Sequence, residues 1–321
     1  MNKTLVIYNP NANRGRNLLI AEELKEVTKT YAQNGSQYGA DVTWMNTQYP
    51  LHATEIASQA AKDGYARVIS IGGDGTFHEI ANGLMQIPAA DRPKLGIVPV
   101  GTGNDFVMGT KSSIPIEANS PRFAFQNAIS RSPDESHLVD IGYVQVGGRP
   151  IHYWCNVVGI GFDAAVNLQS QRINWLKGQA MYFLAVVRTI IEDYAAPELT
   201  MVMDGVHLKQ RVQMLTIGNG TREGGGFITT PQARPDDGVL DFAMCDPVSR
   251  LMMIRLIPEV LKGTHGRFRQ IRIGILKNIT INTNESDQLL VHADGETITG
   301  YDDSVKSIEV GLIPHALGLI Y

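Results

Sequence analysis

Residues 72–76, Gly-Gly-Asp-Gly-Thr, place a carboxylate among three glycines. The apolar run before them predicts a buried strand, and the residues after them predict a helix. Glycines let backbone N–H groups face an anion, and the start of a helix favours negative charge, so this loop could hold a phosphate group. The G-x-x-x-x-G-K-[ST] spacing of a Walker loop is absent. Taken alone, such a loop is more often only a turn between a strand and a helix.

A second glycine-rich loop, Gly-Thr-Gly-Asn-Asp at residues 101–105, follows the next predicted strand, and the polar stretch 9–16 follows the first strand. The carboxyl ends of neighbouring parallel strands meet at one edge of a sheet, so the three loops would converge on one crevice. This convergence predicts a nucleotide site. The carboxylate of Asp74 would repel a triphosphate strongly at short range unless a divalent cation or an organised hydrogen-bond network lay between them. Asp74 therefore predicts Mg²⁺.

Length and composition are those of an ordinary globular protein. At 321 residues the chain is about twice as long as a typical domain, so two domains are expected, and a hydrophobic fraction of 43% supplies enough apolar residues for two cores. No apolar run approaches the roughly 18 residues that cross a bilayer, and the N-terminal apolar run is too short for a signal peptide. A net charge of −4 without a long basic block argues against a nucleic-acid partner.

The two cysteines, Cys155 and Cys245, lie in separate strand-like runs without a C-x-x-C spacing. Buried thiols are therefore expected rather than a disulfide or a metal site. Such cysteine usage fits the reducing cytoplasm.

The first part of the chain alternates strands with helices. Strands are predicted at residues 4–8 and 41–45 and in the two apolar runs before the glycine-rich loops, and helices at 17–31 and 52–62. This alternation predicts a parallel sheet covered by helices on both faces. We therefore expect an α/β nucleotide-binding domain over residues 1–139.

After residue 139 the pattern changes to short alternating runs separated by Gly, Asp and Asn. Turns are predicted at Asp204 and in Ala-Asp-Gly-Glu from residue 293, which favours antiparallel sheets. Helices are predicted at 175–193 and 249–261. A second, β-rich domain is therefore expected over residues 140–304. The closing segment 305–321 is predicted to form strands, which could belong to either domain.

The segments GGDGTFHEIANGL and GTGNDF closely resemble the diacylglycerol kinase catalytic-domain family, which includes bacterial lipid kinases, sphingosine kinases and ceramide kinases. Further segments match the family: NPNANRG at 9–15, TQYPLHATEIA at 47–57, the glycine-rich stretch 218–241 and HADGE at 292–296. NAD kinases share the first loop, but the second loop and the later segments favour lipid kinases. The resemblance implies an N-terminal α/β domain with a parallel sheet, like that of 6-phosphofructokinases and NAD kinases. A β-sandwich domain would follow, with ATP between the two and residues 305–321 returning to the first.

The resemblance also implies roles for individual residues. ATP and Mg²⁺ are the implied cofactors, Asp294 is the implied base for the attacking hydroxyl, and Glu296 would assist it; a hairpin turn is the alternative for this segment. The residues implied in binding ATP, with Asp74 as a catalytic carboxylate beside them, are Asn9, Pro10, Thr47, Gly72, Gly73, Gly75, Thr76, Glu79, Gly101, Thr102 and Asn104. Residues 11–13 depart from the Ser-Gly that the family usually has there, which leaves the role of that loop open.

A second Mg²⁺ site is implied in the segment Ala-Arg-Pro-Asp-Asp-Gly-Val, where the family binds a structural ion. Asp237 would supply its carboxylate, and Arg234 and Val239 their backbone carbonyls. Oxygen ligands and waters suit Mg²⁺. The alternative is a type I turn with solvated aspartates.

The resulting hypothesis is a lipid kinase that transfers the γ-phosphoryl group of ATP to a primary hydroxyl, with diacylglycerol as the first choice of acceptor and phosphatidic acid as the product. The alternatives are a sphingoid, ceramide or other lipid-alcohol kinase, and a non-catalytic nucleotide sensor. The expected location is cytoplasmic and peripheral to the membrane, and a homodimer is left open. A basic surface that could dock on anionic lipid, or be only a solvated face, would comprise Arg250, Arg255, Lys262, Arg267, Arg269 and Arg272.

Overall fold

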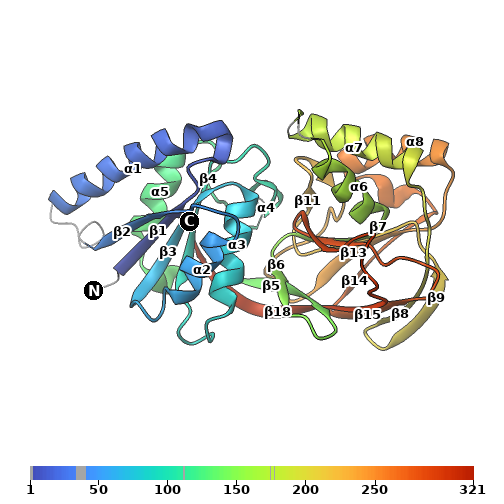
Figure 1. The fold of residues 1–321 in the computed structure, drawn as a ribbon. Coiled ribbons are helices and arrows are strands. Elements are labelled where there is room, and N and C mark those ends of the chain that lie inside the picture. The colour runs from blue at the N-terminus through green and yellow to red at the C-terminus, as the bar shows by residue number, and fades with distance from the viewer. Residues whose placement is uncertain (1–2, 34–40, 111–112, 174, 177) are drawn as a thin grey trace. The chain divides into compact units, whose positions relative to one another are not determined.

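The computed structural model describes residues 3–33, 41–110, 113–173, 175–176 and 178–321 (Figure 1). The chain forms two compact units. Unit 1 comprises Met1–Asp140 and His315–Tyr321, and unit 2 comprises Ile141–Pro314. The second unit is therefore inserted in the sequence of the first.

Unit 1 contains a parallel sheet in the order β2-β1-β3-β4-β18. Its strands are β1 (Lys3–Tyr8), β2 (Val42–Asn46), β3 (Tyr65–Gly72), β4 (Lys94–Pro99) and the end of β18 (Ser307–Ile320), where Leu319 pairs with Leu95. The sequence pattern of buried apolar runs is typical of such a sheet. The predicted parallel sheet is confirmed.

Helices cover this sheet. They are α1 (Arg16–Gln33), α2 (His52–Gln59), α3 (Asp74–Met85), α4 (Asp105–Thr110) and α5 (Pro121–Ser130), with 3₁₀ turns at Ala12–Gly15 and Pro133–Glu135. Helices α1 and α5 share a core with β1, β3 and β4, in which Leu24 and Phe125 meet Ile69. Helix α2 packs against α3, and α3 packs against β3 and β4. Helices α1, α2 and α3 were predicted from the sequence, with small shifts at their ends, whereas α4 and α5 were not predicted.

Unit 2 is a β-sandwich, as the resemblance implied. One antiparallel sheet has the order β14-β13-β10-β7-β16-β17, and the other runs from β18 through β15 and β8 to β9, with β5 and β6 beside β18. The strands are β5 (His137–Val146), β6 (His152–Trp154), β7 (Val157–Gly161), β8 (Glu198–Met203), β9 (Val206–Arg211), β10 (Met214–Gly218), β13 (Leu240–Cys245), β14 (Ile271–Leu276), β15 (Asn278–Thr283), β16 (Val291–Ala293) and β17 (Glu296–Thr299). Residues such as Ile160 and Leu215 from the first sheet meet Met201 and Ile281 from the second in one core.

The two predicted turns of unit 2 are tight hairpins. Asp204 and Gly205 have φ angles of 46° and 87°, and Asp294 and Gly295 have φ angles of 48° and 85°. Positive φ at both central residues is the geometry that favours Asp-Gly in a two-residue hairpin. A small further hairpin is formed by β11 (Arg222–Glu223) and β12 (Phe227–Ile228).

Three helices cover the outer face of the six-stranded sheet in unit 2 (Figure 1): α6 (Phe162–Gln171), α7 (Gln179–Glu192) and α8 (Arg250–Leu261), followed by a 3₁₀ turn at His265–Arg267. Helix α8 matches the prediction, and α7 begins later than predicted. Helix α6 was not predicted. Eight of its ten residues are buried, and polar Asp163 and Asn167 are among them, so burial in this helix does not follow residue type.

Candidate active site

The two glycine-rich loops of unit 1 meet backbone to backbone. A side chain on Gly101 would place its Cβ 2.6 Å from the Cα of Gly73, and one on Gly73 would lie 3.1 Å from the Cα of Gly101. Glycine is therefore required at this crossing. The loop after β3 and the loop after β4 form one continuous backbone surface.

Asp74 is the first residue of α3 and is half-buried. Its Oδ1 accepts a hydrogen bond from the backbone N–H of Phe106 at 3.4 Å, near the start of α4. Gly103 passes close to the other oxygen, because a Cβ there would lie 3.0 Å from Oδ2 of Asp74. The first backbone N–H groups of a helix have no hydrogen-bond partner within the helix, so the start of α3 can bind an anion. The Asp74 carboxylate offers the oxygen ligands that a divalent cation prefers.

Asn104 sets the shape of the second loop. Its backbone has a φ of 51°, and its side chain closes a ring with Gly101, accepting from the N–H at 3.0 Å and donating to the carbonyl at 3.1 Å. The side-chain amide is thus committed to the loop itself. Thr102, at the tip, is exposed.

The loop after β1 joins the same edge of the sheet. Asn17, which is fully buried, donates from Nδ2 to the carbonyls of Asn9 at 2.6 Å and Ile71 at 3.0 Å. The N–H of Asn9 donates to Ile71 at 3.3 Å, and the N–H of Thr47 donates to the carbonyl of Tyr8 at 2.9 Å. The predicted convergence of the three loops is confirmed by these contacts.

The remaining residues implied in ATP binding occupy different surroundings. Glu79 accepts from the N–H of Ala53 at 3.1 Å, so its carboxylate stabilises the start of α2. Gly72 lies under the Thr76 side chain, and Gly75 has open space around it. Pro10 is half-buried beside Asn9. Nucleotide contacts of these residues stay predictions.

In unit 2, Asp294 occupies the hairpin between β16 and β17. Its Oδ2 accepts from the N–H of Cys155 at 2.7 Å, and its Oδ1 accepts from the N–H groups of Asn156 and Val157, both at 2.9 Å. Three backbone donors therefore orient the carboxylate implied as the base. Glu296, at the start of β17, is exposed.

The segment implied as a structural Mg²⁺ site forms an exposed turn. Asp237 accepts from the N–H of Val239 at 3.2 Å, and the Arg234 guanidinium pairs with Asp236 at 3.2 Å. Burial, followed by the charge of Asp237, raises the pKa of Asp241 to about 6. Carboxylates gathered here suit a divalent cation, and the ion itself stays a prediction.

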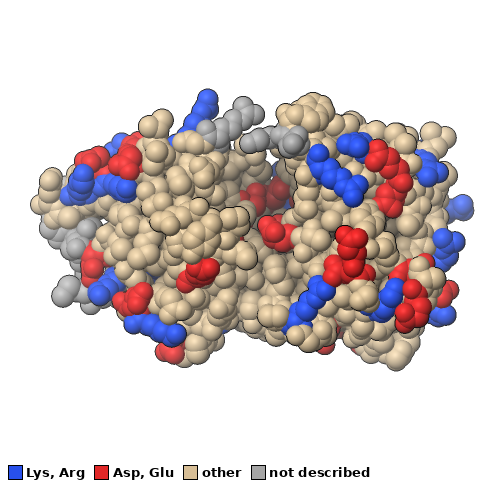
Figure 2. Space-filling model, viewed as in Figure 1, with Lys and Arg blue, Asp and Glu red and all other residues tan. Residues whose placement is uncertain are grey.

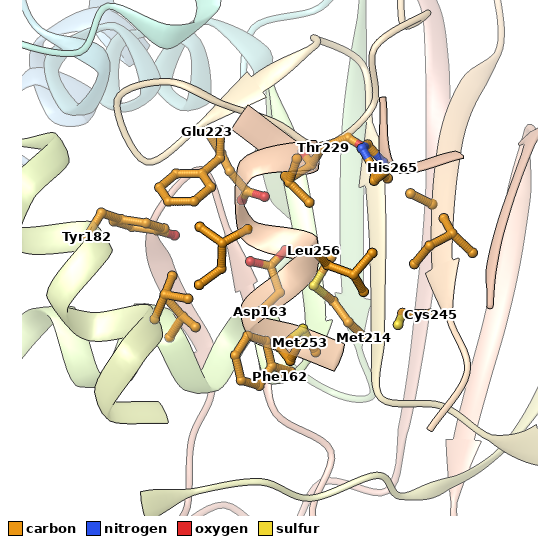
Figure 3. Close-up of a pocket in the computed structure, with 17 residues that line it drawn as sticks. Phe162, Asp163, Tyr182, Met214, Glu223, Thr229, Cys245, Met253, Leu256 and His265 are labelled. Carbon is orange, nitrogen blue, oxygen red and sulfur yellow. The ribbon is translucent and has the colours of Figure 1, made fainter. Parts of the chain in front are cut away.

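An apolar pocket that the sequence did not predict lies between the helices of unit 2 and the outer face of the six-stranded sheet (Figure 3). Its walls are mostly aliphatic and aromatic; they comprise Phe162, Val166, Tyr182, Val186, Met214, Phe227, Ala243, Cys245, Met253, Leu256, Ile257, Val260 and Ile271, with Asp163, Glu223, Thr229 and His265 as the polar members. The pocket is narrow, with a volume of about 60 Å³, so a long ligand would have to displace side chains. Methionines in its wall are suited to such adjustment.

Two buried carboxylates face each other in this pocket. Asp163 enters from α6 and Glu223 from the β11 hairpin, and Figure 3 shows both pointing inward. Nε2 of His292 lies 3.7 Å from Oδ2 of Asp163 and 3.6 Å from Oε2 of Glu223. Sequence reasoning did not connect the three residues because they are far apart in the chain. Glu223 and His292 do lie in the segments 218–241 and 292–296 that resemble the family, and Gly159 leaves space for the cluster beside β7.

The cysteines are buried and free, as predicted. Burial raises the pKa of Cys245 to about 12, and burial together with the charge of Asp294 raises the pKa of Cys155 well above its usual range. Neither thiol is therefore a ready nucleophile.

Comparison with known proteins covers nearly the whole chain. Residues 3–141 match the diacylglycerol kinase catalytic domain, and residues 156–321 match the YegS C-terminal NAD kinase beta sandwich-like domain. A diacylglycerol kinase of Mycobacterium tuberculosis is 27% identical over 81% of this chain and 80% of its own length. A Yersinia pestis protein named "Probable lipid kinase YegS-like" is 26% identical over 92% of this chain and 90% of its own.

Solved structures show the same fold. The crystal structure of a diacylglycerol kinase from Bacillus anthracis covers 99% of this chain and 96% of its own, with a TM-score of 0.69 at 21% identity. Among the residues that the structure describes, no helix is both long enough and apolar enough to cross a membrane.

Proposed function

Since this chain belongs to the family of diacylglycerol kinases and related lipid kinases, we propose that it transfers the γ-phosphoryl group of ATP to a primary hydroxyl of a membrane lipid, with diacylglycerol as the first acceptor. The observation that supports a lipid acceptor is the apolar pocket of unit 2. The Asp163 and Glu223 carboxylates of this pocket lie close to the ring of His292. His292 belongs to β16 and lies two residues before Asp294. An apolar chain bound in this pocket would lie in the same unit as the implied base.

Phosphoryl transfer needs positioned reactants, neutralised charge and a base for the attacking hydroxyl. The glycine backbone of the two crossing loops would position the phosphates, and Asp74 would hold Mg²⁺, which supplies positive charge to the phosphate oxygens. Asp294, oriented by three backbone N–H groups, would accept the proton of the lipid hydroxyl.

A membrane contact through α7 and α8 forms part of this proposal. Apolar side chains on these helices are exposed, among them Leu251 at 77% and Ile254 at 52% in α8 and Phe183 at 47% in α7. The basic residues beside them are partly neutralised: Arg267 pairs with Glu259, and Arg272 with Asp246. Figure 2 accordingly shows basic and acidic side chains interspersed on this unit. Insertion of apolar side chains, more than charge, would anchor the protein.

The deciding experiment supplies the purified protein with ATP, Mg²⁺ and mixed micelles of diacylglycerol, monoacylglycerol, sphingosine, ceramide or phosphatidylglycerol, with NAD as a further acceptor. Mass spectrometry should find a phosphorylated lipid, with diacylglycerol the best, and Asp74→Asn should abolish it. Phosphorylation of NAD alone would refute the proposal. ATP binding without any product would instead support the nucleotide sensor.

A further inference from the structure

The carboxylate implied as the base is held by a short backbone segment, and that segment is held in turn by the loop after β10. Residues 155–157 donate three N–H groups to Asp294. We infer that Asn219, the first residue after β10, is a positioning residue for phosphoryl transfer: it fixes residues 155–157 and polarises the peptide groups that orient the Asp294 carboxylate. This inference rests on the proposed function for the role of Asp294 as the base.

Asn219 contacts the segment through both its side chain and its backbone. Its Nδ2 donates to the carbonyl of Cys155 at 2.9 Å, and its backbone N–H donates to the carbonyl of Asn156, also at 2.9 Å. The N–H of Gly220 donates to the same Asn156 carbonyl at 2.9 Å. The Asn219 side chain is 0% exposed, so removing its amide would leave the Cys155 carbonyl without this donor in a place that solvent does not reach.

Two peptide groups connect Asn219 to the carboxylate of Asp294. The first joins Cys155 to Asn156; its carbonyl accepts from Nδ2 of Asn219, and its N–H donates to Oδ1 of the carboxylate. The second joins Asn156 to Val157; its carbonyl accepts from the backbone N–H of Asn219, and its N–H donates to the same oxygen. Hydrogen bonds in such a chain strengthen one another. Asn219 therefore makes both N–H groups better donors to the carboxylate.

The sheet brings the two segments together. Val157 of β7 pairs with Gly218 of β10, so the residues just before β7 and just after β10 lie side by side. A Cβ on Gly220 would overlap Oδ1 of Asn156, so a larger residue there would displace the Asn156 side chain. The fold thus presents the Asn219 amide to the segment that orients the carboxylate.

Gln213 supplies a matched control. It is a second buried amide, 2% exposed, at the other end of β10, and its Nε2 donates to the carbonyl of Ala195 at 2.7 Å. This bond ties down the loop between α7 and β8 and does not involve residues 155–157. Asn219→Ala and Gln213→Ala each remove one donor from a backbone carbonyl, so they should destabilise unit 2 to a similar extent.

The test combines kinetics with hydrogen exchange, both measured well below the Tm of each variant. In Asn219→Ala the kcat for lipid phosphorylation should fall at least about tenfold while the KM for ATP changes less than about twofold, because a misplaced base slows the chemical step without weakening nucleotide binding. Gln213→Ala should keep kcat within about twofold of the wild type. By NMR, the amides of residues 155–157 should exchange at least about tenfold faster in Asn219→Ala than in Gln213→Ala, and the amides of β15 should exchange alike in both.

Three results would overturn the positioning role: an unchanged kcat in Asn219→Ala, an equal loss of kcat in Gln213→Ala, or unchanged exchange at residues 155–157. Failure of the proposed function looks different, because the wild type itself would then phosphorylate no acceptor, while the exchange comparison would still show whether Asn219 holds the segment. Where Asn219→Ala does not fold, Asn219→Asp replaces the donor by an acceptor of the same shape, and Gln213→Glu is its control.

Discussion

Asp294→Asn is the substitution that would ordinarily test a catalytic base, and in this protein it should also destabilise unit 2. The carboxylate joins the β16–β17 hairpin to residues 155–157 through three backbone N–H donors. We therefore expect a large loss of stability in addition to any loss of turnover.

The size of the loss follows from the three bonds. Asparagine keeps one oxygen, which can retain the two bonds now made by Oδ1, but its NH₂ group would face the N–H of Cys155. An unsatisfied buried N–H costs about 1–3 kcal/mol, and two bonds that lose charge assistance cost about 1 kcal/mol each. The free energy of unfolding should fall by about 3–5 kcal/mol, which for a unit of this size lowers Tm by roughly 10 °C.

Thermal unfolding of the wild type, Asp294→Asn and Glu296→Gln measures this effect. Glu296 lies in the same hairpin but is exposed, so its substitution should change the free energy of unfolding by less than about 0.5 kcal/mol. Activity should then be compared well below the lower Tm. A Tm of Asp294→Asn within a degree or two of the wild type would show that the three bonds do not stabilise the hairpin, and the reasoning would be refuted.

Four further outcomes are expected. Gly101→Ala should destabilise unit 1 by about 1–3 kcal/mol, because its Cβ would press on the facing loop. Gly75→Ala, which has open space within α3, should raise the Tm slightly, because alanine favours the helix. At pH 8 iodoacetamide should leave both raised-pKa thiols unmodified in the folded protein and alkylate both in denaturant, as read by mass spectrometry. Burial lowers the pKa of His265 below its ordinary 6.5, so near pH 6 the unfolded chain binds a proton at this residue that the folded chain does not bind. The Tm should therefore fall as the pH drops from about 7 to about 5. In His265→Gln the Tm should fall less steeply over the same range. Leu251→Asp should weaken sedimentation with lipid vesicles at least about threefold while leaving Tm unchanged, since this side chain is 77% exposed; unaltered sedimentation would rule out a contact through this part of α8.

Local chemistry made much of unit 1 predictable. The glycines of residues 72–76 and 101–103 mark the turns after β3 and β4, and parallel strands bring such turns to one edge of the sheet. The crossing of Gly73 and Gly101 follows from that topology. The sequence does not reveal that Glu79 stabilises α2, because its carboxylate bonds to the backbone of Ala53, which only the fold brings near. Asn104, by contrast, bonds to Gly101 within its own loop.

The site in unit 2 was less accessible to sequence reasoning. Asp163, Glu223 and His292 come from a helix, a small hairpin and a strand, so no spacing connects them. The helix that carries Asp163 buries polar as well as apolar residues, so residue type does not reveal which side chains lie inside. The hairpin turns at Asp204 and Asp294 were predictable, by contrast, because the left-handed backbone conformation of a tight turn favours particular residue types.

The insertion of unit 2 within unit 1 has a consequence for the order of folding. During synthesis the ribosome completes residues 141–314 before it reaches the segment of β18 that pairs with β4. Until then β4 presents an unpaired edge, which is prone to pair with other chains. The β-sandwich can therefore fold before the end of β18 has been added to the sheet of unit 1. Fragments that stop near residue 140 lack this strand and should aggregate.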